Sequence, residues 1–141
     1  MKLKGRFGTV IALLMAIFVI AGATALAAFD PRTGGWKGTT AQGKPLSFVV
    51  FDGGDKVRKF KFTVVARCEG GTLTTSGTLP FTAPVTNANR FEFHGVSGDS
   101  RIDIKGRFTA RRQARGSMVF NGSHPQVGSC HRATTWKGHK A

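Results

Sequence analysis

The 141-residue chain contains no tyrosine, only two tryptophans, and only 7 acidic residues against 21 Lys and Arg. Carbohydrate-binding modules use exposed Trp or Tyr rings, and here Tyr is missing and both Trp fall at positions that a core would use. The hydrolase motifs G-x-S-x-G and H-E-x-x-H are also absent. The Gly-Gly pairs at 34–35, 53–54 and 70–71 lack the Lys and the helix of a phosphate-binding loop. We therefore expect a protein that is not an enzyme.

The scarcity of acids restricts any catalytic alternative to one pair. Four of the seven, Asp52, Asp55, Glu69 and Asp99, fall in predicted turns, where short acidic side chains are common. Glu92 and Asp103 fall on the solvent faces of predicted strands, and His94 shares the face of Glu92. A secreted hydrolase that uses Glu92 and Asp103 as its two carboxylates is the alternative function. The simpler interpretation is that both pair with neighbouring Arg and Lys.

The first 27 residues have the three parts of a secretory signal peptide. Residues 1–8 carry three cations and no acid, residues 9–22 are apolar or small, and Ala25-Leu26-Ala27 is an A-x-A cleavage site. We predict cleavage after Ala27, with Ala28 as the second choice. An uncleaved membrane anchor is the alternative, since residues 9–28 are just long enough to span a bilayer. Neither Cys is at the end of the leader, which argues against a lipoprotein.

The rest of the chain, residues 28–141, is predicted to be one domain, with 18 basic and 7 acidic residues and hence a net charge of +11. Its two cysteines, Cys68 and Cys130, predict one disulfide in an oxidising compartment. Closing a loop of about 60 residues would stabilise the fold by roughly 4 kcal/mol. The alternative is a metal site that includes His124, Cys130, His131 and His139, but zinc-site spacings are absent. We expect no metal and no cofactor.

The domain alternates apolar and polar residues with period two and shows no helical stripe. The clearest strand is 57–68, in which Phe60, Phe62 and Val64 share one face and Lys59 and Lys61 the other. Gly, Asn and Asp turns recur every 8 to 12 residues, so we predict an antiparallel β-sandwich or flattened barrel of about eight strands. Residues 81–89 are interpreted as a connection, with a short strand within it as the alternative, and residues 121–129 as a loop. The other predicted strands are 36–40, 46–51, 72–79, 90–96, 101–109, 114–120 and 130–136.

Several short motifs carry a family resemblance. They are W-x-G-x-T at 36–40, L-S-F-x-V at 46–50, V-x-x-F-x-F at 57–62, I-x-G-x-F at 104–108, A-x-G at 114–116, and a late Cys130 followed by Trp136. Over about residues 35–140 the chain resembles small secreted β-rich domains of bacteria, abundant in actinobacteria. The resemblance implies a fold and export, and it implies no activity. A C-x-G segment is replaced by C-H-R at 130–132. The repeat of W-K-G at 36–38 and 136–138 is interpreted as first and last strands that meet.

The outward positions of the predicted strands are rich in cations. If they share one surface, the natural ligands are anionic cell-envelope polymers or lipid head groups. The alternative is a solvated cationic surface that keeps the protein soluble. Because the aromatic residues alternate inward, base stacking and sequence-specific nucleic-acid binding are not expected. We predict an exported, monomeric, non-enzymatic domain of the envelope or extracellular space, with a basic face drawn from Lys59, Lys61, Arg67, Arg101, Lys105, Arg107, Arg111, Arg112 and Arg115.

Overall fold

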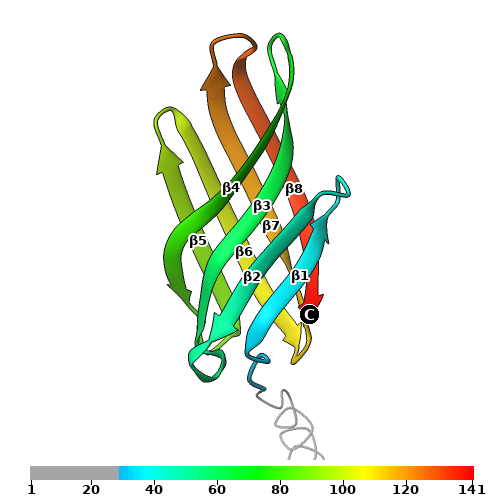
Figure 1. Cartoon of the computed structure of the whole chain (residues 1–141), viewed down its shortest axis with the longest axis vertical. Coiled ribbons are helices and arrows are strands. Elements are labelled where there is room, and N and C mark those ends of the chain that lie inside the picture. Colours follow the sequence, from blue (N-terminus) through cyan, green and yellow to red (C-terminus); the bar gives the residue numbers. More distant parts are fainter. Residues whose placement is uncertain (1–28) are drawn as a thin grey trace, which may run out of the picture.

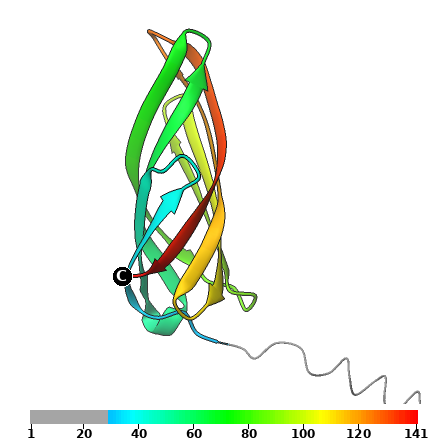
Figure 2. The ribbon, with the colours of Figure 1, turned by 90° about the vertical axis from the view of Figure 1, so that its right-hand side faces the viewer.

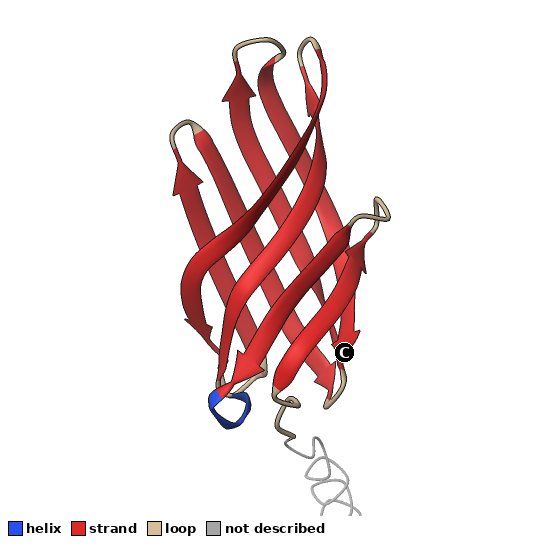
Figure 3. Cartoon of the chain, viewed as in Figure 1, coloured by secondary structure: helices blue, strands red, loops and turns tan. Residues whose placement is uncertain are grey.

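The computed structural model describes residues 29–141, which form eight antiparallel strands closed into a small barrel (Figures 1 and 3). The order around the barrel is β4-β3-β2-β1-β8-β7-β6-β5. The all-β prediction with about eight strands is confirmed, and the barrel alternative is the correct one. The strands are β1 (Gly34–Thr40), β2 (Pro45–Phe51), β3 (Lys56–Cys68), β4 (Gly71–Pro84), β5 (Arg90–Ser97), β6 (Ser100–Ala110), β7 (Gln113–His124) and β8 (Gly128–Lys140).

Alternation places one face of each strand in a core made largely of aromatic rings. Phe48 stacks on Trp36 at 5.6 Å between ring centroids and on Phe60 at 5.5 Å. Phe91 and Trp136 complete the cluster, and both are almost fully buried. Such offset and edge-to-face ring pairs each add about 1 kcal/mol to the burial of their apolar surface. Side chains therefore fill the barrel, and the two Trp serve packing, as the sequence indicated.

β3 departs from simple alternation at one residue. Lys59 has φ of 53°, and the pairing register shifts on both sides of it. This β-bulge inserts one extra residue into β3. Val57 and Phe60 therefore both face the core, although they are three positions apart and simple alternation would place them on opposite faces. Lys59 itself is exposed at the bulge.

The first and last strands close the sheet, as the repeated W-K-G suggested. β1 pairs with β8 so that Gly38 lies opposite Gly138 and Thr40 opposite Trp136. A Cβ on Gly38 would come within 2.9 Å of the Gly138 Cα, so this position requires glycine. Figures 1 and 2 show the β3–β4 and β7–β8 hairpins extending beyond the other hairpins at one end of the barrel.

At that end β3 pairs directly with β8, with Cys68 opposite Cys130. The two are joined by the predicted disulfide across a Cα–Cα distance of 4.0 Å. The bond uses both cysteines of the chain. Cys130, which the alternative metal site included, is therefore disulfide-bonded. A disulfide is consistent with an exported protein.

The predicted leader lies outside the described residues. Within the described residues, no helix is long and apolar enough to cross a membrane.

β4 and β5 are the two ends of the sheet and are not hydrogen-bonded to each other, so they form a seam in the barrel wall. β4 runs through Pro80 to Pro84, whereas the sequence placed its end at residue 79. Proline is tolerated there because an edge strand has one side without ladder partners. β7 and β8 likewise extend into the predicted loop 121–129, of which only residues 125–127 lie outside strands.

Candidate functional site

Four exposed cations form one line across β5, β6, β7 and β8. Arg90 lies opposite Arg107, Arg107 opposite Arg115, and Arg115 opposite Lys137. All four are exposed on the outer face of the barrel. Adjacent strands are about 4.8 Å apart, so the line is roughly 14 Å long at its backbone. We call these residues the cationic row.

The cationic row borders a shallow hollow of about 430 Å³ in the outer face. Lys105 adds a fifth cation to its lining, Ser117 and Thr135 add hydroxyl groups, and Glu92 is the one acid. The hollow lies over Gly106 and Gly116, whose Cβ positions face the core rings of Phe91 and Trp136. A Cβ on Gly106 would come within 2.2 Å of the Phe91 ring, so the core rings pack directly against this part of the backbone.

Within residues 29–141, no acidic side chain forms an ion pair with the cationic row. The ion pairs of residues 29–141 join Lys56 to Asp52, His94 to Glu92 and Asp103, and Arg101 to Asp103. Glu92, the acid nearest the row in the hollow, lies 3.4 Å from His94 Nε2. Like charges directly opposite each other in a sheet are destabilising. The arrangement keeps positive charge available to an anion, because no acid of residues 29–141 forms an ion pair with these four cations.

The two predicted carboxylates are brought together around one imidazole. His94 Nδ1 lies 2.6 Å from Asp103 Oδ1, and Arg101 Nε lies 3.2 Å from Asp103 Oδ2. The hydrogen bond to Asp103 raises the pKa of His94, and the same bond lowers the pKa of Asp103. Glu92 lines the hollow beside the cationic row, whereas Asp103 does not, so the two carboxylates share no cleft there. The geometry is that of an exposed ion-pair cluster on the outer face.

The predicted basic face divides into separate groups. Lys105, Arg107 and Arg115 meet at the hollow, and Arg111 and Arg112 form the adjoining β6–β7 turn. Lys59 and Lys61 lie on β3, from which β7 is separated by β2, β1 and β8. Arg67 lies opposite His131 near the disulfide, and Arg101 pairs with Asp103. The sequence therefore predicted the surface charge, but only part of the predicted set is contiguous.

Two members of the cationic row, Arg90 and Lys137, were missed. Alternation alone places Lys137 outward beside the inward Trp136, so its exposure was readable from the sequence. Its position next to Arg115 depends on the β7–β8 register, which no local pattern encodes. Arg90 opens β5, where alternation with the inward Phe91 also places it outward, but its position opposite Arg107 depends on the β5–β6 register. The described residues contain no group of three or more ligand side chains suited to a metal.

The sequence matches no protein-family model, and neither the curated proteins nor the solved structures give a match.

Proposed function

We propose that this chain is an exported, non-enzymatic β-barrel domain that binds anionic polymers of the cell envelope or extracellular space through the cationic row. The observation that carries the proposal is the unneutralised line of Arg90, Arg107, Arg115 and Lys137 beside a hollow with hydroxyl groups. Arg presents a planar fork of donors that suits phosphate and carboxylate oxygens, and three of the four residues are Arg.

Export is part of the proposal and has separate support. The leader has a basic start, an apolar stretch and an A-x-A site, and the domain contains a disulfide. The net charge of +11 after the leader favours association with polyanions at low ionic strength. The bulk charge alone, however, would attract a polyanion to any part of the barrel, so the test must separate the cationic row from the rest of the surface.

The test measures binding of long-chain polyphosphate and of a purified teichoic-type polymer over a salt series. Each cation that contacts the polymer releases counterions, so the logarithm of the affinity falls with the logarithm of salt by about 0.7 per contact. We expect the Arg107→Gln/Arg115→Gln variant to lose one to two of these contacts. The magnitude of its salt slope should therefore be smaller than that of the wild type by roughly 1. The matched control, Lys44→Gln/Lys61→Gln, removes the same charge from the β1–β2 turn and β3.

Two results would overturn the proposal. The first is no retention of the wild-type protein at low salt. The second is an equal loss of slope in both double variants, which would mean that the polymer responds to net charge and does not use the cationic row. N-terminal sequencing of the protein recovered outside the cell tests the export part independently, with Ala28 expected as the first residue.

A further inference from the structure

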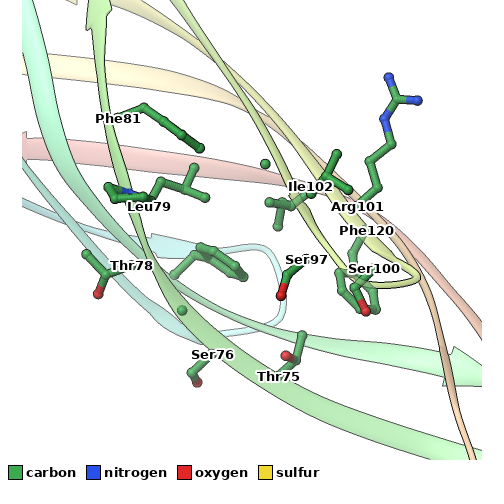
Figure 4. A pocket seen from close by; sticks show the side chains of 15 residues that line it. Thr75, Ser76, Thr78, Leu79, Phe81, Ser97, Ser100, Arg101, Ile102 and Phe120 are labelled. Atoms are coloured by element: carbon green, nitrogen blue, oxygen red, sulfur yellow. The ribbon is translucent and has the colours of Figure 1, made fainter.

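A second hollow, of about 520 Å³, lies at the seam between β4 and β5 (Figure 4). This volume falls within the range of about 300–1,000 Å³ that small-molecule sites occupy. Its apolar lining comes from five strands that meet only in the closed barrel. The apolar residues are Phe62, Leu79, Phe81, Val96, Ile102 and Phe120.

The hollow accounts for both large apolar side chains that are exposed within residues 29–141. Phe81 is 47% exposed and Val96 is 74% exposed, and they border the hollow from β4 and from β5. Single exposed apolar residues are common on protein surfaces. Here the pair flanks a floor of buried apolar groups, so an occupant of the hollow would remove both from water together with that floor.

The charge around this hollow contrasts with the rest of the protein. Of the 18 basic residues in the domain after the leader, only Arg101 lines it, and no acid does. Arg101 forms an ion pair with Asp103, with 3.2 Å between Nε and Oδ2. Its terminal Nη groups make no hydrogen bond within the described part of the chain. Figure 4 shows its guanidinium extending from the rim, away from the apolar floor. The lining thus offers an apolar floor, hydroxyl groups such as Ser97 and Ser100, and one cation at the edge.

The seam also offers a route of entry. β4 and β5 are joined by side-chain packing, with Leu79 so close to Gly95 that a Cβ there would meet Leu79 Cδ2 at 2.8 Å. Because β4 and β5 share no ladder hydrogen bonds, the two strands can separate here by loss of side-chain packing alone, whereas every other pair of neighbouring strands in the described barrel is hydrogen-bonded.

We infer that this hollow binds a single-chain anionic amphiphile, such as a long-chain carboxylate. The hydrocarbon chain lies over Leu79 and Ile102 between Phe81 and Val96, and the anionic head group lies at the rim beside Arg101. Charge complementarity favours an anionic head group over a cationic one, because no acid lines the hollow and its one cation, Arg101, is ion-paired to Asp103 only through Nε. The site uses none of the residues of the cationic row, so each of the two proposals can be tested independently of the other.

The test titrates the purified, oxidised chain with dodecanoate below its micelle-forming concentration, with dodecyltrimethylammonium as the cationic counterpart. Calorimetry gives stoichiometry and affinity, and amide NMR shifts locate the site. We expect one dodecanoate per chain, shifts at β4, β5 and β6, and binding of the cationic detergent at least about tenfold weaker. Val96→Asp places a carboxylate at the mouth and should weaken dodecanoate binding about tenfold or more. Arg101→Gln should abolish the preference between the two head groups.

The matched control is Thr39→Asp, which adds the same charge at an exposed position of β1 and should leave dodecanoate binding unchanged. Non-saturable binding, equal affinity for both detergents, or an unaffected Val96→Asp variant would overturn the inference. So would a dimer that dissociates in Val96→Asp, since a second copy of the chain would then be the occupant. Shifts confined to β7 and β8 would assign the carboxylate to the cationic row and overturn it as well.

Discussion

Arg107 lies directly opposite Arg115 in the ladder between β6 and β7, with Arg90 beyond the first and Lys137 beyond the second. Four neighbouring cations with no acid partner in the described barrel raise the free energy of its folded state. Because the cationic row lowers the stability of the fold, its effect on the free energy of unfolding can be measured without the ligand.

Replacing Arg115 by Gln should therefore stabilise the barrel while it weakens polyanion binding. We expect a gain of about 0.2–1 kcal/mol in the free energy of unfolding at low salt, from urea denaturation. The gain should shrink in 1 M salt, where the screening length is about 3 Å. Lys61→Gln is the control, since Lys61 faces Ser47 and Thr78 and should show no such gain. A loss of stability in Arg115→Gln at low salt would contradict the expectation.

The disulfide should contribute a large part of the stability. Cys68 and Cys130 are 62 residues apart in the chain, and opening a loop of that length costs roughly 4 kcal/mol on the chain-entropy model. The Cys68→Ser/Cys130→Ser variant should lose about that amount in urea denaturation. Reduced wild-type protein should match the variant. A variant as stable as the oxidised protein would show that the β3–β8 pairing needs no covalent support.

The His94–Asp103 pair should respond to pH in a defined direction. Because the pKa of His94 is raised above 6.5, its contribution to stability is fully present below pH 6.5 and is lost as the pH rises through the raised value. Because the pKa of Asp103 is lowered below 3.8, its contribution is present above pH 3.8 and is lost as the pH falls through the lowered value.

NMR titration of the His94 ring measures this directly. Asp103→Asn should move the pKa of His94 down toward 6.5, because the hydrogen bond to Asp103 is the largest cause of the shift. Asp99→Asn, in the β5–β6 turn, should leave it in place. An unchanged His94 pKa in Asp103→Asn would mean that Glu92 or the solvent sets it.

Gly106 should be intolerant of any side chain. A Cβ there would come within 2.2 Å of the buried Phe91 ring, and overpacking of this kind costs about 3 kcal/mol. Gly106→Ala should therefore lower the free energy of unfolding by about that amount. Gly35→Ala is the control, since a Cβ at Gly35 meets nothing within 4 Å, and it should change stability by less than about 0.5 kcal/mol. Equal effects in the two variants would show that Phe91 has room to move.

Period-two alternation determined the strands and the core face at the level of the sequence alone. Phe60, Phe62 and Val64 had to be buried together because a strand turns every second side chain the same way. The even cysteine count indicated the disulfide, and W-K-G at both ends indicated that the first and last strands meet. These features are local or compositional, which is why they could be predicted.

Only the tertiary structure decided which outward residues became neighbours. Arg107 was known to face water, but its place between Arg90 and Arg115 depends on register, and a shift by one residue would turn those side chains inward. The bulge at Lys59, the separation of Lys61 from the cationic row, and the seam that exposes Phe81 and Val96 are equally non-local. The sequence thus determined what faces solvent, while pairing between distant strands decided where charge gathers and where the wall is left open.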